Sequence, residues 1–352
     1  MSSSFVKLFS ASCLALFLLV FCGDAVAAYY VLENKNDSVI GELQQIRAEY
    51  RDTLLDIARS NGLGYRDIKL VNPELDTWLP GDGREIVLPS QYILPQAPHN
   101  GIILNIPEMR LYYFPEGNKP GSVDVITYPL GVGREGWDTP YVDTHIIQKK
   151  KNPSWLPPDS IRQEHEAMGD PLPERIGPGP MNPLGNYALR LGLPGYLIHG
   201  TNKPYGIGMR VSHGCIRLYP EDIKSLFKKV KLGTPVHIVN QPYKVGQHEG
   251  KIYLEAHPFM QEDAGNFEDN LTSVVRMLVK ITNKRAYKVD WELAKRVIHD
   301  MKGIPVVIGR LVQPPVNAIV ENRHDDMLEA GSQVLKLRLE TSLSAIRHGQ
   351  LD

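Results

Sequence analysis

The sequence is poor in cysteine, which limits how the fold can be stabilised. Its 352 residues include three cysteines, Cys13, Cys22 and Cys215, and the first two lie in an apolar N-terminal stretch. A secreted domain stabilised by disulfides carries an even number of cysteines. With the N-terminal stretch set aside, Cys215 is the single cysteine left. A disulfide-stabilised fold is therefore excluded, and we expect this thiol to be either buried or chemically active.

The sequence also lacks an excess of charge of either sign. Lys and Arg number 39, Asp and Glu number 40, and the formal net charge is −1. A nucleic-acid-binding domain is usually strongly basic, so this balance argues against that class. Hydrophobic residues make up 42% and charged residues 22%, which excludes a disordered chain and a coiled-coil rod. The length fits two or three domains, and the 27 prolines and 30 glycines favour β-rich domains with many turns.

A single apolar run stands at the N-terminus, and it is short. The run from Leu8 to Phe21 follows Lys7, and Ala25-Val26-Ala27 is a small-x-small cleavage site. This layout predicts a secretory signal peptide over residues 1–27. A transmembrane anchor is the alternative, but a span needs roughly 20 apolar residues. A lipoprotein signal ending at Cys22 is a third interpretation, and the bulky phenylalanine before this cysteine argues against it. We expect no stable membrane span after cleavage.

Residues 29–95 are predicted to form a small α+β domain. The segment has a helix start at Asp52-Thr53, a second short helix ended by Pro73, and a strand over residues 85–89. It resembles the LysM peptidoglycan-binding module, although the Gly-Asp-Thr of that module is Arg51-Asp52-Thr53 here. The matching residues are Tyr50, Asp52-Thr53-Leu54, Ile57-Ala58, Gly62, Leu70, Asn72-Pro73, Leu79, Gly81 and Ile86 to Pro89.

Residues 97–240 are predicted to form a mainly β domain with one or two helices. Short apolar runs bounded by turn residues predict strands, and Pro220 in a first turn with Ile223, Leu226 and Phe227 on one face predicts a helix. The Pro- and Gly-rich segment 151–195 is expected to be a long functional loop, such as a lid, or disordered. The predicted strands cover residues 102–106, 110–114, 123–128 and 236–239.

Residues 250–310 are predicted to form an α+β C-terminal subdomain. Apolar residues between Leu271 and Ile281 recur at helical spacing, and Asp290 is a candidate cap for a helix that reaches Met301 and stops at Gly303. A strand is expected over residues 304–308. Residues 311–352 are charged and amphipathic, which predicts a weakly helical or mobile tail.

The stretch around Cys215 carries the residue types needed for nucleophilic catalysis. A cysteine attacks as its thiolate, and a nearby imidazole or cation raises the thiolate fraction. His213 and Arg217 flank Cys215 by two residues, and His199 lies sixteen residues before it. Gly214 allows a tight backbone turn beside the nucleophile. Two other interpretations remain open: a buried core thiol, and a zinc site formed by His199, His213 and Cys215.

These residues also resemble the signature of the L,D-transpeptidases with a YkuD-type catalytic domain. The signature is a histidine followed, after a spacer, by Ser/Thr-His-Gly-Cys, an apolar residue and Asn or Arg; here it is His199 and Ser212 to Arg217. The resemblance covers roughly residues 29–310, and an N-terminal LysM-like unit is typical of the Gram-negative periplasmic branch. A departure is Thr139-Pro140-Tyr141-Val142, where many relatives have Thr-Pro-x-Gly. Further matching segments are Gly131-Val132-Gly133, Trp137 to Pro140, Asn152 to Pro158 and His199 to Asn202.

The resemblance implies a YkuD-like β-sandwich with short helices and an acyl transfer on peptidoglycan stem peptides. Cys215 would attack the carbonyl of the third residue and release D-Ala, with His199 as the general base. The same resemblance implies that carbapenems acylate Cys215. Arg217 suits a substrate carboxylate, because its planar guanidinium matches that group. The remaining expected site residues are His213, Gly214, Gly200 and Ser212, which would shape the site and its oxyanion hole, and Asn202, Trp155 and Tyr205, which would bind substrate.

The resemblance also implies partners and a location. Peptidoglycan is the expected substrate and the periplasm the expected compartment. The acyl acceptor is left open between a diaminopimelate amine, a lysine of an outer-membrane lipoprotein, and water, which would make the enzyme an L,D-carboxypeptidase. No cofactor, metal or nucleic acid is expected. The alternatives are a wall-binding protein without activity and a zinc hydrolase.

Overall fold

The computed structural model describes residues 28–312 except 35, 118–120, 268–269 and 283–285. The predicted signal peptide over residues 1–27 and nearly all of the predicted tail over residues 311–352 lie outside the described residues. Within the described part of the chain, no helix combines the length and the apolar character needed to cross a membrane.

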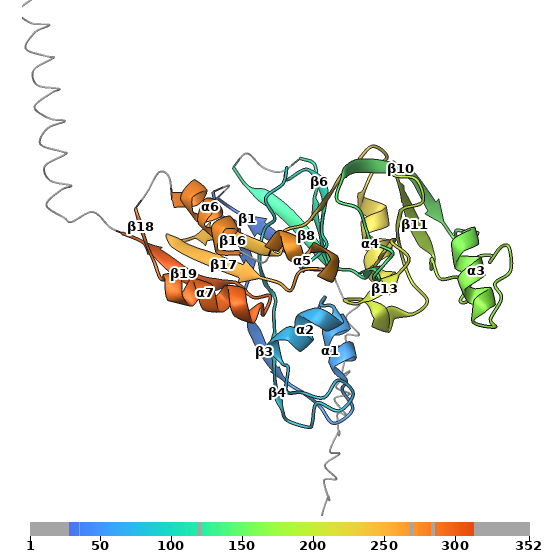
Figure 1. Cartoon of the computed structure of the whole chain (residues 1–352), viewed down its shortest axis with the longest axis horizontal. Helices are drawn as coiled ribbons and strands as arrows, with labels where there is room; N and C mark the ends of the chain where they lie inside the picture. The colour runs from blue at the N-terminus through green and yellow to red at the C-terminus, as the bar shows by residue number, and fades with distance from the viewer. Residues whose placement is uncertain (1–27, 35, 118–120, 268–269, 283–285, 313–352) are drawn as a thin grey trace, which may run out of the picture.

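A nine-stranded sheet forms the centre of the protein (Figure 1), in the order β1-β8-β7-β6-β15-β10-β11-β12-β14. Three of the four predicted strands are confirmed almost unchanged, as β6, β7 and β15, and the one predicted over residues 123–128 is β8, one residue longer. The strands are β1 (Ala28–Leu32), β6 (Gly101–Asn105), β7 (Arg110–Phe114), β8 (Val123–Pro129), β10 (Asp143–Lys151), β11 (Tyr187–Leu191), β12 (Leu197–His199), β14 (Ile216–Arg217) and β15 (Pro235–Val239).

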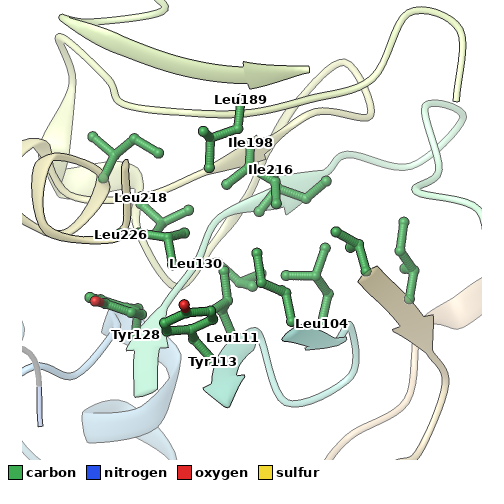
Figure 2. Close-up of a cluster of buried hydrophobic side chains, with 14 of the residues drawn as sticks. Leu104, Leu111, Tyr113, Tyr128, Leu130, Leu189, Ile198, Ile216, Leu218 and Leu226 are labelled. Atoms are coloured by element: carbon green, nitrogen blue, oxygen red, sulfur yellow. The ribbon is translucent and has the colours of Figure 1, made fainter. Parts of the chain in front are cut away.

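The sheet folds over on itself at β10. The first residues of β10, from Asp143 to His145, pair with β15, and its later residues pair with β11. Figure 2 shows that side chains from β11, β12 and β14 face side chains from β6, β7 and β8 across a common core. Helix α4 (Pro220–Lys229) closes one side of this core with Ile223 and Leu226. The predicted mainly β domain is confirmed, and its two layers are the two halves of one continuous sheet.

The N-terminal unit is built from two short helices against a two-stranded sheet. Strands β3 (Gln44–Arg47) and β4 (Glu85–Leu88) pair antiparallel around α1 (Leu54–Ser60) and α2 (Tyr65–Val71). Thr53 caps α1 by accepting a hydrogen bond from the Asp56 amide at 3.1 Å, as its position in the sequence predicts. Strand β1, however, joins the nine-stranded sheet beside β8, so the start of segment 29–95 pairs with the central sheet.

Charged and polar contacts fix this unit to the central domain. Arg59 of α1 forms a bidentate ion pair with Glu221 of α4, at 2.7 and 2.9 Å. The buried Arg110 of β7 contacts Asp67 of α2 at 2.6 Å. Strands β2 (Val39–Gly41) and β5 (Gln91–Ile93) pair with each other. They lie against β16 (Tyr243–His248) and β17 (Lys251–Ala256) of the C-terminal region.

The C-terminal region combines strands and helices, as expected, but its sheet begins at Tyr243, before the predicted start at residue 250. Its sheet has the order β16-β17-β19-β18 and is covered by α6 (Asn270–Thr282) and α7 (Trp291–Asp300). Asp290 caps α7 as expected, but the helix ends at Asp300, because Met301 adopts a left-handed conformation. The strand expected over residues 304–308 runs from Val306 to Leu311. The other elements are β16 (Tyr243–His248), β17 (Lys251–Ala256), β18 (Tyr287–Val289), β19 (Val306–Leu311), η2 (Gln261–Asp263) and α5 (Ala264–Phe267).

A buried ionic cluster joins this subdomain to the central sheet. The ammonium of Lys244 on β16 lies 2.8 Å from Glu108 and 2.8 Å from Glu255, and all three side chains are fully buried. The hydroxyl of Tyr112 donates to Glu108, and His257 lies 2.6 Å from Glu255. A buried charge is tolerated when it is paired and hydrogen-bonded, as here.

The prediction of a long structureless loop over residues 151–195 is wrong. The segment contains α3 (Asp159–Ala167) and β11, and the intervening chain is held by the buried amide of Asn182, which donates to Pro153 O at 2.8 Å and Gly177 O at 3.0 Å. Pro158 immediately before α3 suits a helix start, because its own missing N–H is not needed there. Two further short elements, β9 (Val132–Gly133) and β13 (Arg210–Ser212), pair in parallel, and η1 (Pro204–Gly206) lies between β12 and β13.

Candidate active site

Cys215 lies in a tight turn between β13 and β14. Gly214 has φ +92°, a conformation that L side chains rarely adopt, and a Cβ there would lie 3.0 Å from the ring of Tyr196. The hydroxyl of Ser212 donates to Cys215 O at 2.5 Å, and the hydroxyl of Thr139 donates to Gly214 O at 2.9 Å. The turn is therefore fixed from both sides, and the half-buried thiol lies 3.6 Å from Gly195 O.

The pairing of β12 with β14 places three of the expected residues on one face. The strands are parallel, with Ile198 opposite Ile216 and His199 opposite Arg217. Ile198 and Ile216 point into the core that Figure 2 shows. Because side chains alternate along a strand, His199 and Arg217 lie on the opposite face, and Cys215 immediately precedes β14 in the turn. The guanidinium of Arg217 is close enough for its charge to act on both the His199 imidazole and the Cys215 thiol.

His199 is held as a neutral imidazole. The ring is buried, and Nδ1 donates its proton to Gly200 O at 2.6 Å. Burial lowers the pKa of His199 to about 3, and the positive charge of Arg217 acts in the same direction. With the proton on Nδ1, Nε2 carries an unshared electron pair at neutral pH. That is the state required of a general base.

Cys215 is not held as a thiolate, which corrects the expectation that His199 and Arg217 favour that form. Burial raises the pKa of the Cys215 thiol, and the Leu197 backbone and the charge of Arg217 offset this only in part. A neutral His199 contributes no positive charge to stabilise a thiolate. The resting pair is therefore a thiol beside a neutral imidazole, and the thiol loses its proton during the reaction.

Arg217 is a half-buried cation with spare hydrogen-bonding capacity. One guanidinium nitrogen donates to Val211 O at 3.1 Å, whereas the buried Nε has no partner among the described residues. No carboxylate in the described part of the chain forms an ion pair with Arg217. Burial also lowers the pKa of Arg217. A desolvated, unpaired guanidinium next to the nucleophile is suited to bind an anion.

The Nε2 atom of His213 contacts Glu164 and Arg134, two residues that the sequence analysis did not single out. Its Nε2 lies 2.9 Å from a carboxylate oxygen of Glu164 on α3. The ring of Trp137 packs edge-on against the His213 ring, with centroids 4.8 Å apart and an interplanar angle of 81°. Arg134 also bonds to Glu164. No local sequence signal links Glu164 to His213, since 49 residues separate them.

The expected substrate-binding residues outside this group are spread apart. Asn202 is exposed in the loop after β12, and the half-exposed Tyr205 lies near Arg59 of α1. Trp155 forms a backbone bridge with Ile176 in the segment that carries α3. Within the part of the chain that the structure describes, no hydrogen bond or ion pair joins these three side chains to Cys215. Tyr196, which the sequence analysis did not single out, lies beside the turn instead, and Cys215 contributes to the raised pKa of its hydroxyl.

The geometry does not support zinc at the predicted trio. The ring nitrogen of His213 faces Glu164 and Arg134. Among the described residues, one group of three has ligand atoms close enough for a shared ion: Glu108, Glu255 and His257. There the ammonium of Lys244 already lies 2.8 Å from both carboxylates.

Comparisons with known proteins agree on one family. Residues 99–238 match YkuD, described as an L,D-transpeptidase catalytic domain. The chain is 38% identical over 291 residues to the protein named "Probable L,D-transpeptidase YbiS" from Escherichia coli K12, covering 81% of this chain and 94% of that protein. It is 39% identical over 259 residues to "Probable L,D-transpeptidase YcfS" from the same strain, covering 72% and 79%. It is 35% identical over 303 residues to "Probable L,D-transpeptidase ErfK/SrfK" from Salmonella typhimurium LT2, covering 83% and 95%.

Proposed function

The chain belongs to the L,D-transpeptidase family, and from this premise we propose that Cys215 is the nucleophile of an acyl transfer between peptidoglycan stem peptides. The observation that carries the proposal is the common face of β12 and β14. It places the neutral imidazole of His199 opposite the unpaired guanidinium of Arg217, two residues after Cys215.

In the first step, Cys215 forms a thioester. Nε2 of His199 takes the thiol proton as sulfur attacks the carbonyl carbon of the third stem residue. The C–N bond to D-Ala then breaks, and the proton passes from His199 to the leaving amine. The fixed turn over Ser212 to Cys215 holds backbone amides near the new oxyanion, and fixed donors of this kind stabilise such a charge.

In the second step, an acceptor amine attacks the thioester. His199 takes a proton from the amine, a new amide bond forms, and the sulfur leaves and is reprotonated. A diaminopimelate amine as acceptor gives a 3→3 cross-link, and a lysine of an outer-membrane lipoprotein gives an anchored lipoprotein. Water as acceptor releases the shortened stem peptide.

Arg217 is the proposed recognition group for the donor. The third stem residue, when it is diaminopimelate, carries a free carboxylate at the far end of its side chain. A guanidinium that is half-buried and unpaired gains a charge-assisted hydrogen bond when that carboxylate binds. The same contact would orient the carbonyl toward Cys215.

The LysM-like unit and export are proposals of their own. The motif around Asp52-Thr53-Leu54 and the compact packing of α1 and α2 on β3 and β4 support a peptidoglycan-binding role for residues 29–95. The apolar run and cleavage site over residues 1–27 support export to the periplasm. In the full chain, replacement of the exposed Tyr50 with alanine should make the protein pellet less well with insoluble sacculi, whereas undiminished pelleting would contradict a binding role for this residue.

A tetrapeptide stem tests the proposed activity directly. We expect the protein to release D-Ala and to give a thioester mass on the peptide containing Cys215. Cys215→Ala should abolish both, with its circular dichroism spectrum unchanged. Equal D-Ala release by the two proteins would contradict the proposal and leave an inactive wall-binding protein as the alternative. Mass analysis of muropeptides formed with each acceptor then identifies the amine.

A further inference from the structure

Glu164 connects α3 to the nucleophile turn. This residue lies on α3, in the segment between β10 and β11, and Figure 1 shows α3 beyond the ends of those two strands. Its carboxylate contacts Nε2 of His213, two residues before Cys215, at 2.9 Å. It also bonds to the guanidinium of Arg134, which follows β9. Three segments far apart in the sequence therefore meet at one carboxylate.

The distances bear on whether Nε2 of the His213 ring carries a proton. Nε2 lies 2.9 Å from Glu164 and 3.2 Å from an Arg134 nitrogen. A guanidinium only donates and an ionised carboxylate only accepts, so Nε2 cannot satisfy both neighbours. The carboxylate is the nearer partner, and Arg134 already donates to the other oxygen of Glu164. Arg134 and Glu164 together thus favour a proton on Nε2 of His213.

We propose that Glu164 is a positioning residue for the acyl transfer: it holds His213 in the Nε2–H form and fixes α3 against the turn that carries Cys215. The inference rests on the proposed function of Cys215. It adds a residue that takes no direct part in the chemical steps. His213 in this state donates to Glu164 and has no free electron pair at Nε2. The base role therefore stays with His199.

The contacts of the ring explain why its orientation matters for the nucleophile. Trp137 packs edge-on against one side of the His213 ring, and Glu164 holds the ring edge. Gly214, which has φ +92°, lies between His213 and Cys215 in the sequence. With both contacts in place, the backbone before Cys215 has little freedom to rotate. A misplacement of roughly 1 Å at a reacting atom can cost about 100-fold in rate.

The contacts of Glu164 with Arg134 and His213 contribute little to global stability. Removing the Glu164 carboxylate should therefore affect the reaction without unfolding the protein. The side chains of Arg134, Glu164 and His213 are 38%, 23% and 22% exposed. Ion pairs with this exposure stabilise a protein only slightly. Arg134 and then His213 also hold the pKa of the Glu164 carboxyl below its usual value, so it stays ionised at neutral pH.

The experiment compares Glu164→Ala and Glu164→Gln in the full chain with Glu166→Ala, an exposed glutamate on the same helix. We expect Glu164→Ala to lower kcat for D-Ala release between roughly 10- and 100-fold, with KM and Tm little changed. Glu164→Gln keeps an acceptor oxygen and should recover part of the rate. His213→Ala should show the same loss, and the double variant should lose no more than either single variant.

Nitrogen-15 spectra of the histidine side chains supply the readout that a merely structural role would not change. The wild-type His213 signal should report a proton on Nε2, and Glu164→Ala should shift it toward a mixture of tautomers. An unprotonated Nε2 in the wild type, or full activity of Glu164→Ala, would overturn the proposal. If the wild-type protein forms no thioester, the proposed function itself is contradicted. Failure of the proposed function can therefore be distinguished from failure of the proposed role of Glu164.

Discussion

Arg210 and Glu262 are joined by two hydrogen bonds, from Nη1 at 2.9 Å and from Nη2 at 2.7 Å. Arg210 lies in β13, which leads directly into the turn of Cys215, and it also donates to Gly133 O at 3.1 Å. Glu262 belongs to the C-terminal region, outside the residues 99–238 that match the catalytic family. The C-terminal region therefore contacts the strand that leads into the turn of Cys215.

Glu262→Ala should lower the rate of Cys215 acylation by up to roughly 100-fold, because β13 loses the bidentate contact that fixes its position. Stopped-flow measurement of thioester formation checks this. Glu292→Ala is the matched control, because Glu292 pairs at the surface with Lys295 alone. An acylation rate equal to that of the wild type would restrict Glu262 to a role within the C-terminal region.

His199→Ala should cost more activity than His213→Ala. Nε2 of His199 is free to accept the thiol proton, whereas Nε2 of His213 faces Glu164. General-base assistance accelerates a reaction by roughly 10²–10⁴-fold, and loss of a positioning contact costs less. Single-turnover acylation of each variant gives the comparison. A larger defect in His213→Ala would reverse the two roles.

The sequence predicted the parts of the site that have a local signature. His199, Cys215 and Arg217 lie within nineteen positions, and the glycine beside Cys215 marks the turn that the structure contains. Gly200, an expected site residue, is the next residue in the sequence, and its carbonyl accepts a hydrogen bond from Nδ1 of His199 at 2.6 Å. Helix α4 was predictable for the same reason, since its proline and its apolar face are local features.

What the sequence did not predict depends on contacts between distant segments. Helix α3 has a single buried apolar residue, Ile161, so it lacks the apolar periodicity that predicts a helix. Polar contacts such as that of Glu164 with His213 hold it in place. The pKa of Cys215 was expected in the wrong direction, because spacing reveals the neighbouring charges and not the depth of burial.

Asp222→Asn should stabilise the protein at alkaline pH. Burial first, and then the charge of Glu221, raise the pKa of Asp222 from 3.8 to about 8, against the opposing effects of Arg110 and Arg59. A raised folded-state pKa stabilises the fold fully below the unfolded value, and this stability is lost as the pH rises through the folded value.

The variant and the wild type should therefore have similar Tm values near pH 4, and the variant should be the more stable above pH 8. Thermal unfolding across this pH range measures the difference. Asp82→Asn, at an exposed turn, is the control and should leave the pH profile unchanged. A constant Tm difference at every pH would show that the gain does not arise from the titration of Asp222.

The last prediction separates the two ways in which Cys215 can lose its proton. Alkylation by iodoacetamide needs a preformed thiolate, and burial raises the pKa of Cys215 above the ordinary value for a thiol. Its rate should therefore remain low at pH 7 and rise steeply only in the alkaline range. Acylation by a carbapenem should remain faster than alkylation at pH 7, because Nε2 of His199 is unprotonated at that pH and can accept the proton during attack. His199→Ala should remove this difference, so that acylation follows the same alkaline profile as alkylation. Intact-mass measurement of both adducts across a pH series, on the wild type and the variant, gives the four profiles. Rapid alkylation of the wild type at pH 6 would show a preformed thiolate and contradict the neutral thiol–imidazole pair.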